Sequence, residues 1–204
     1  LVPDCIRSLL KGEKILIHTS NFRAVKRVQD VIKIFNEVRK KVPSKLILVG
    51  DGPDRSSCEL LTRELDLQQH VRFLGKQLEL VPILSAADLF LMPSQSESFG
   101  LSALEAMSCG VPVVSSSVGG LPELQVHGET GYIAEIGDIE RMAKYAVELL
   151  TNETKHSLFS ANARRRAVEH FDISKIVDQY EAYYMRCLGM NVGVSRTREV
   201  PPTS

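Results

Sequence analysis

The sequence predicts an α/β domain built on a doubly wound, Rossmann-like parallel sheet, and three observations support this fold class. Short apolar runs alternate with stretches of helical periodicity along most of the chain. Within the runs, apolar and polar residues do not alternate, which indicates strands that helices bury on both faces. Polar and glycine-rich segments follow several runs directly, at the strand ends where such sheets bind ligands.

Each element follows from its own local pattern. The apolar runs predict strands at residues 15–18, 45–49, 71–74, 88–93, 111–114 and 131–134. Helical periodicity predicts connecting helices at 28–38, 60–65, 80–84 and 100–109. From about residue 138 to about residue 189 the chain is expected to be helical. The last helix has one apolar face, formed by Ile173, Ile176, Val177, Tyr180, Tyr184 and Cys187.

Length and composition are typical of a globular protein with one domain or at most two small ones. The chain has 204 residues, 44% of them hydrophobic and 25% charged, so it can bury a core without disulfide or metal support. Lys and Arg together number 25, as do Asp and Glu, and this balance argues against a nucleic-acid binder. No run approaches about 18 apolar residues, so no membrane span is expected.

The N-terminus and the cysteines indicate the cellular setting. The sequence begins at Leu1, without an initiator Met or a signal-peptide pattern, so we expect an excised piece of a longer cytoplasmic protein. The cysteines are isolated from one another and from histidines at zinc-ligand spacing, which predicts small buried thiols in a reducing compartment. They are Cys5, Cys58, Cys109 and Cys187.

The segment 94–107 has the strongest functional pattern. Glu97 follows the fourth predicted strand, and Glu105 lies eight residues later inside the next predicted helix. Helical spacing places Glu105 on one face with Leu101 and Leu104, a face that we expect to be buried. A buried carboxylate needs partners, which could be ligand hydroxyls or the backbone amides of a neighbouring loop.

The same segment presents backbone amides at a helix N-terminus, around Ser98, Phe99 and Gly100. Such amides suit phosphate oxygens or sugar hydroxyls. In the alternative interpretation, Ser96 or Ser98 only caps the helix. Capping explains a serine, but it does not explain two glutamates at this spacing.

Two other strand-end loops are candidates for ligand contact. Arg23, Lys26 and Arg27 gather where a predicted helix begins, and a bound anion would explain cations at that end of the helix dipole. The alternative is a solvated basic turn. In the segment 115–123, Gly119 and Gly120 allow close backbone approach or positive φ.

The histidines form no H-x-x-x-H pair that would indicate a metal site. His18 lies at a strand end just before the cationic loop, and its role stays open. A structural or surface role is expected for the others, His70, His127, His156 and His170.

These residues together carry a family resemblance. Glu97-x7-Glu105, inside the run S-E-S-F-G-L-S-A-L-E-A-M, resembles the retaining glycosyltransferases of family 4, which have the GT-B fold. The segments V-G-D-G-P, S-V-G-G-L-P-E-L and H-G-E-T-G-Y match the same family in order, so the resemblance covers about residues 14–188. The loop S-N-F-R-x-V-K-R most resembles the branch that joins N-acetylglucosamine to L-malate in bacillithiol biosynthesis.

The resemblance implies a domain organisation. GT-B enzymes have an N-terminal acceptor domain and a C-terminal donor domain, and this chain resembles the C-terminal one. Residues 1–13 would then be a linker from the missing acceptor domain, and 14–170 the nucleotide-sugar-binding domain. Residues 171–189 would form a C-terminal helix and 190–204 a flexible tail. Part of the apolar face of that helix would be exposed and could drive homo-oligomerisation.

The resemblance also implies substrates and residue roles. The donor would be UDP-N-acetylglucosamine and the acceptor L-malate, with no metal or other cofactor. Glu105 would accept hydrogen bonds from the ribose hydroxyls, and Glu97 would contact the donor sugar and diphosphate. Lys26 and Arg23 would neutralise the leaving diphosphate. The remaining donor contacts would come from Ser98, Phe99, Gly100, Leu101, Asn21 and Gly119, with Arg72, Phe73 and Leu74 beside the uracil.

One departure from the family pattern affects the arginine. Family members commonly have Gly-Arg five or six residues before the loop lysine, whereas here Asn21 is five residues before Lys26 and the arginine is Arg23. The alternatives are a transferase for another nucleotide hexose such as UDP-glucose or GDP-mannose, a UDP-N-acetylglucosamine 2-epimerase, and a non-catalytic nucleotide-sugar-binding module. Without the acceptor domain, weak UDP binding and negligible transfer are expected.

Overall fold

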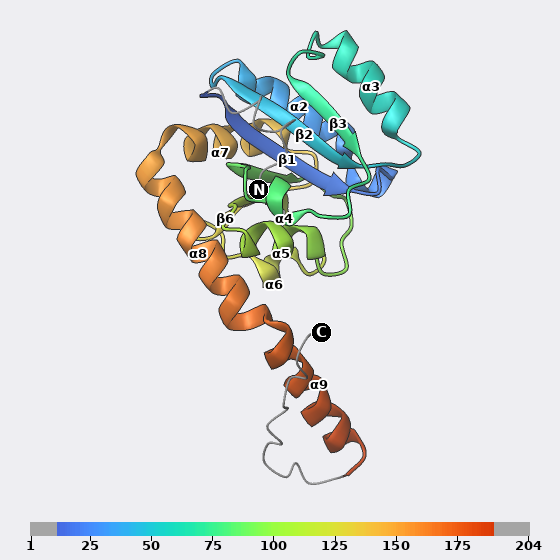
Figure 1. The fold of residues 1–204 in the computed structure, drawn as a ribbon, viewed down its shortest axis with the longest axis vertical. Coiled ribbons are helices and arrows are strands. Elements are labelled where there is room, and N and C mark those ends of the chain that lie inside the picture. Colours follow the sequence, from blue (N-terminus) through green and yellow to red (C-terminus); the bar gives the residue numbers. More distant parts are fainter. Residues whose placement is uncertain (1–11, 190–204) are drawn as a thin grey trace, which may run out of the picture. The chain divides into compact units, whose positions relative to one another are not determined.

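The computed structural model describes residues 12–189, and it contains a parallel sheet with helices on both faces (Figure 1). The first eleven positions of the predicted linker and the predicted tail at 190–204 lie outside the described residues. The chain divides into two compact units between Val168 and Glu169, within one long helix.

Six strands form one sheet in the order β3-β2-β1-β4-β5-β6, and every neighbouring pair is parallel. Their bounds are β1 (Lys14–Ser20), β2 (Ser44–Gly50), β3 (Val71–Gly75), β4 (Leu89–Met92), β5 (Val113–Ser116) and β6 (Gly131–Ala134). This order is that of a doubly wound sheet, so the predicted fold class is confirmed. The winding reverses between β1 and β4, where a ligand crevice is expected.

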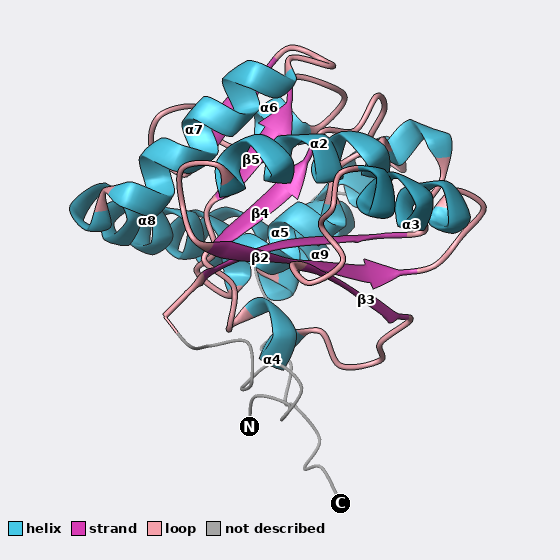
Figure 2. Ribbon diagram, turned by 90° about the horizontal axis from the view of Figure 1, so that it is seen from above, coloured by secondary structure: helices cyan, strands magenta, loops and turns pink. Residues whose placement is uncertain are grey.

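The helices connect the strands. They are η1 (Ala24–Lys26), α2 (Val28–Arg39), α3 (Arg55–Glu64), α4 (Val81–Leu84), α5 (Leu101–Ser108), α6 (Leu121–Leu124), α7 (Ile139–Thr151), α8 (Glu153–Phe171) and α9 (Ile173–Cys187). Helices α2 and α3 lie on one face of β2 and β3 and α4 on the other (Figure 2). Helix α7 packs against α2, and α5 packs against α4. Within 12–189, no helix is long and apolar enough to cross a membrane.

The core lies between the sheet and these helices, as the apolar runs predict. Ile15, Leu16 and Ile17 of β1 are all completely buried, which is the double-sided burial that their lack of alternation indicates. Phe35 of α2 is also fully buried in this core.

The predicted buried face of the segment 100–109 is wrong. Helix α5 buries Ala103, Ala106 and Met107, while Leu101 is 67% exposed and Glu105 is exposed as well. The small alanine side chains allow α5 to lie close to its neighbours, so the leucine spacing does not mark the packed face.

The predicted helical region after residue 138 consists of three separate helices. Asn152 separates α7 from α8, and its side chain accepts a hydrogen bond from the backbone amide of Lys155 at 2.9 Å. Asp172 separates α8 from α9 and caps α9 by accepting from the amide of Ser174 at 3.0 Å. Short polar side chains of this kind favour helix N-termini, so the sequence contained the signal for both interruptions.

Burial of the thiols is confirmed for only one cysteine. Cys58 is fully buried, Cys109 is partly buried and Cys187 is exposed, while Cys5 lies outside the described residues. Cys187 belongs to α9, none of whose described residues is buried. The apolar face predicted for that helix is exposed at Tyr180 (59%) and Tyr184 (60%), whereas Ile176 and Val177 are half-buried.

Candidate functional site

An open pocket of about 680 Å³ lies at the carboxyl ends of β1 and β2, beside the loop that leads into α5. This is the point where the winding of the sheet reverses. Its walls are the end of β1 with Asn21, the end of β2, the loop after β3, and residues 97–102 with Glu105. Most of the predicted site residues therefore meet in one place.

Lys26 and Glu97 form an ion pair at this pocket, although they are 71 positions apart in the sequence. The Lys26 Nζ atom donates to Glu97 Oε1 at 2.7 Å, and the Glu97 side chain is only 7% exposed. The hydroxyl of Ser94 donates to the same oxygen at 2.8 Å. A backbone bond between the amide of Gln95 and the carbonyl of Val25, at 2.7 Å, also joins the two loops. The carboxylate therefore has a fixed position in which one of its two oxygens is engaged.

Two glycines support the loop that contains Glu97. Gly119 has a φ of +51°, and a Cβ atom built on it would lie 1.6 Å from the carbonyl oxygen of Glu97. A Cβ on Gly120 would lie 2.8 Å from the carbonyl oxygen of Ser98, to which the amide of Gly120 donates at 3.2 Å. The two glycines thus provide the close backbone approach that the sequence predicts. They do not line the pocket themselves, but they contact the backbone of the loop that contains Glu97.

The N-terminus of α5 opens toward the pocket without a side-chain cap. Gly100, not a serine, occupies the N-cap position, with a φ of +93°, so the interpretation of Ser96 or Ser98 as the cap is wrong. A left-handed conformation favours glycine at this position. Among the described residues, the amides of Leu101 and Ser102 have no hydrogen-bonding partner. They can therefore bind an anion or a polar ligand atom.

Glu105 lines the pocket from the exposed face of α5, about two turns into the helix. The surrounding protein partly desolvates the carboxylate and raises the pKa of Glu105 above its ordinary value. The side chain forms no salt bridge with the described residues. A carboxylate in this setting gains from hydroxyl donors of a ligand.

The end of β1 contains a buried histidine next to the pocket. His18 is fully buried, with Nδ1 2.8 Å from the carbonyl oxygen of Leu91 and Nε2 2.8 Å from the hydroxyl of Ser20. Burial lowers the pKa of His18 to about 4, so the ring is neutral at pH 7. Thr19 Oγ1 is buried beside the pocket and has no hydrogen-bonding partner among the described residues.

Several predicted residues lie away from the pocket. Arg23 is exposed and does not line the pocket. Arg27 does not line it either, and the anion that the sequence predicts near Arg27 is a side chain of this protein. Arg27 Nε donates to the buried carboxylate of Asp30 at 2.6 Å, so the anion belongs to the next turn of the chain. Arg72 Nη1 donates to the carbonyl oxygens of residues 68 and 71, back toward the start of β3.

The residues predicted at the end of β3 do not line the pocket, but the loop that follows them does. Phe73 packs edge-on against Phe22, and the guanidinium of Arg55 lies 5.8 Å from the centre of its ring. Neither Phe73 nor Leu74 lines the pocket. The pocket is lined instead by the next loop, through Lys76, Gln77 and Leu78, which were not predicted from the sequence. No motif marks these residues, and their one signal is that they follow a predicted strand at its carboxyl end.

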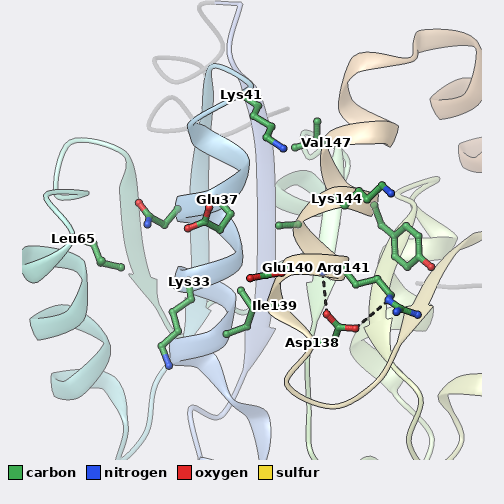
Figure 3. Close-up of a pocket in the computed structure, with 13 residues that line it drawn as sticks. Lys33, Glu37, Lys41, Leu65, Asp138, Ile139, Glu140, Arg141, Lys144 and Val147 are labelled. Atoms are coloured by element: carbon green, nitrogen blue, oxygen red, sulfur yellow. Dashed lines mark hydrogen bonds and ion pairs between the residues drawn. The ribbon is translucent and has the colours of Figure 1, made fainter.

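A larger groove of about 1150 Å³ lies between α2 and α7 (Figure 3). Its charged side chains are partly paired locally: Asp138 accepts from the amide and the guanidinium of Arg141 at 3.1 and 3.0 Å, and Lys40 pairs with Glu37. Residues 12–189 contain no group of three His, Cys, Asp or Glu side chains that could hold a metal ion. The pocket at the strand ends is the better candidate, because predicted site residues line it and none lines the groove between α2 and α7.

Comparisons with known proteins show which family this chain belongs to. The model of the family described as "Glycosyl transferases group 1" matches residues 6–166. The N-acetyl-alpha-D-glucosaminyl L-malate synthase of Bacillus anthracis is 48% identical over 174 residues, which cover 85% of this chain and 46% of that protein. The 2-deoxystreptamine N-acetyl-D-glucosaminyltransferase of Niallia circulans is 30% identical, over 83% of this chain and 45% of that protein.

Solved structures share the fold. The Anabaena protein HepE, solved with UDP and glucose, superposes with a TM-score of 0.82 at 26% identity, over 91% of this chain and 53% of that one. Staphylococcus aureus TarM, solved with UDP and alpha-GlcNAc-glycerol, gives 0.79 at 25% identity, over 84% and 35%. The chain spans about half the length of the curated relatives that it matches.

Proposed function

Because this chain belongs to the glycosyl transferases group 1 family, we propose that it forms the donor-binding half of an enzyme that transfers N-acetylglucosamine from UDP-N-acetylglucosamine to L-malate. The single observation that supports it best is the Lys26–Glu97 pair beside the uncapped start of α5. Identity to the named synthase over most of the chain supports the choice of sugar and acceptor.

The pocket suits the departure of a nucleoside diphosphate. Transfer breaks the bond between the sugar carbon and a phosphate oxygen, so negative charge develops on the leaving UDP. Lys26 supplies a positive charge beside that oxygen, and the free amides of Leu101 and Ser102 supply donors. Groups fixed before the reaction stabilise developing charge without reorganising, and no metal ion is needed for this role.

The two carboxylates divide the recognition of the donor. Glu97, fixed by Lys26 and Ser94, faces the transferred sugar with its second oxygen. Glu105 accepts hydrogen bonds from the ribose hydroxyls, which removes the cost of its partial desolvation. The acceptor and any group that takes its proton belong to the half of the enzyme that this chain lacks.

Calorimetric titration of this chain with UDP, UDP-N-acetylglucosamine, GDP and ADP, each with and without Mg²⁺, tests the proposal. We expect selective binding of the uridine nucleotides, independent of Mg²⁺. Glu105→Ala should weaken that binding about 10-fold or more, as the loss of charge-assisted hydrogen bonds does. Glu129→Ala, which alters an exposed glutamate outside the pocket, is the matched control and should bind as the original chain does.

The outcomes separate the alternatives. Preference for GDP or ADP, or a requirement for Mg²⁺, would overturn the donor assignment. UDP-glucose is titrated in the same way, and binding equal to that of UDP-N-acetylglucosamine would favour a transferase for another hexose, an alternative that the HepE complex with UDP-glucose supports. The acceptor is tested by product analysis with the chain joined to the acceptor domain. L-malate should be converted to a glycoside that retains the configuration of the donor sugar. A free epimerised sugar would instead indicate a 2-epimerase.

A further inference from the structure

Ser20 lies at the pocket wall, two residues after the buried His18 of β1. Ser20 lines the pocket and pairs in the sheet with Gly50, where a Cβ atom would lie 1.8 Å from the Ser20 carbonyl oxygen. The neighbouring strand therefore holds the backbone of Ser20 closely. The direction of its hydroxyl hydrogen depends on His18.

The contacts of His18 determine which ring nitrogen holds the proton. Nδ1 lies 2.8 Å from the carbonyl oxygen of Leu91, which can only accept, so Nδ1 is the donor. The ring is fully buried beside Phe22 and Phe90, and within residues 12–189 it forms no hydrogen bond with a carboxylate. The charges of Lys26 and Glu97 reach it only at longer range and act in opposite directions. The neutral ring therefore presents Nε2 as an acceptor.

This protonation state fixes the role of the Ser20 hydroxyl. With Nε2 as the acceptor at 2.8 Å, the hydroxyl must donate its one hydrogen to His18. Its oxygen then has two lone pairs, one of which accepts weakly from the amide of Phe22 at 3.3 Å. The other can accept from a ligand, but the hydroxyl has no hydrogen left to give to a phosphate oxygen.

We propose that Ser20 is an acceptor-only contact in the pocket, held in that role by His18, and that it binds a hydroxyl group of the nucleotide sugar. This inference rests on the proposed function. The hydroxyl belongs either to the ribose or to the transferred sugar, and both offer the same hydrogen-bond chemistry. Ser20 would then select for the sugar part of the donor, while Lys26 and the α5 amides bind the diphosphate.

The test is calorimetric binding of three ligands to Ser20→Ala: UDP-N-acetylglucosamine, UDP and 2′,3′-dideoxy-UDP. Loss of one hydrogen bond should weaken the affected ligand about 3- to 10-fold. A loss for UDP-N-acetylglucosamine alone assigns the contact to the transferred sugar. A loss for UDP as well, but not for the dideoxy analogue, assigns it to the ribose. Unchanged affinity for all ligands, or an equal loss for all three, would overturn the proposal.

Variants of His18 test separately whether this histidine orients the hydroxyl of Ser20. His18→Asn keeps a donor for Leu91 but removes the acceptor for Ser20, and it should weaken the same ligand. The double variant His18→Asn/Ser20→Ala should lose no more affinity than Ser20→Ala, because both changes break one relay. Additive losses would refute the relay. His18→Gln, which can return an acceptor near the Nε2 position, should partly restore affinity.

Two controls keep the interpretation clear. Ser117→Ala changes an exposed serine just after β5, outside the pocket, and should leave all three affinities unchanged. Thermal unfolding of each variant identifies a loss of folding. If the original chain binds no nucleotide sugar, the proposed function fails and this inference with it. If it binds and Ser20→Ala binds equally well, this inference alone fails.

Discussion

The substitution Gly119→Ala tests how the Glu97 loop is held. A Cβ atom at this position would lie 1.6 Å from the carbonyl oxygen of Glu97 and 2.8 Å from its carbon. Real Cβ atoms essentially never come within 3.0 Å of such atoms, so the two backbones must separate by at least 1.4 Å. The obstacle is backbone rather than the end of a flexible side chain, and so the loop itself has to move.

The expected effect has two parts. Alanine in a left-handed conformation, here a φ of +51°, costs about 1–2 kcal/mol in the free energy of unfolding. Displacement of Glu97 would remove the contact with the donor proposed above, and the loss of a hydrogen bond to a charged group corresponds to about 10- to 100-fold in affinity. Because 10- to 100-fold in affinity corresponds to about 1.4–2.8 kcal/mol, the loss in binding should be of the same order as the cost of the backbone strain.

Gly128→Ala is the matched control. Gly128 has a φ of +82°, but nothing lies within 4 Å of a Cβ built there, so only the backbone strain applies. Thermal unfolding should show a small stability loss in Gly128→Ala and a larger one in Gly119→Ala, because only the latter has a steric clash as well as strain. Calorimetry with UDP-N-acetylglucosamine should show weakened binding only in Gly119→Ala. If Gly119→Ala binds the donor within twofold of the original chain, the loop does not need its observed position.

Two further predictions follow from buried titratable groups. The pKa of His18 falls from 6.5 to about 4 on folding, so the unfolded chain takes up a proton between these pH values that the folded chain does not. The contribution of His18 to stability is complete above pH 6.5 and is lost as the pH falls toward 4, so the free energy of unfolding should drop by at most about 3 kcal/mol from this group. Urea unfolding at a series of pH values measures this drop. In His18→Gln, the free energy of unfolding should change less steeply with pH. An unchanged slope would contradict this. Burial raises the pKa of Cys58 to about 12, whereas Cys187 is exposed, so peptide mapping after iodoacetamide treatment should find Cys187 labelled about 100-fold faster in the folded chain. Similar rates would show that the core opens readily.

The sheet could be predicted from sequence because its strands have a strong and local signal. The segment Ile15–Ile17 is apolar at every position, and the structure buries it on both sides. Such runs need no knowledge of distant residues. The polar segments that follow these runs predicted the approximate location of the pocket, because the carboxyl ends of parallel strands all lie at one edge of the sheet.

Contacts between distant residues could not be predicted in this way. The Lys26–Glu97 pair joins loops that meet only because β1 and β4 are neighbours in the sheet. The face of α5 was misjudged because Leu101 looks like a core residue, although it lies at the pocket mouth and is 67% exposed. For Arg27 the missed signal was local, namely an acid three positions later, which is the spacing of an ion pair on a helix.

The position of β1 has a consequence for the way the chain folds. Leu16 pairs on one side with Leu46 and on the other with Leu89, which is made 73 residues after it. During synthesis, β2 can join β1 early, but the second edge of β1 stays unpaired until β4 emerges. An apolar strand with unpaired backbone groups is a template for wrong association between chains. The most aggregation-prone interval in the synthesis of this segment should therefore fall between β3 and β4.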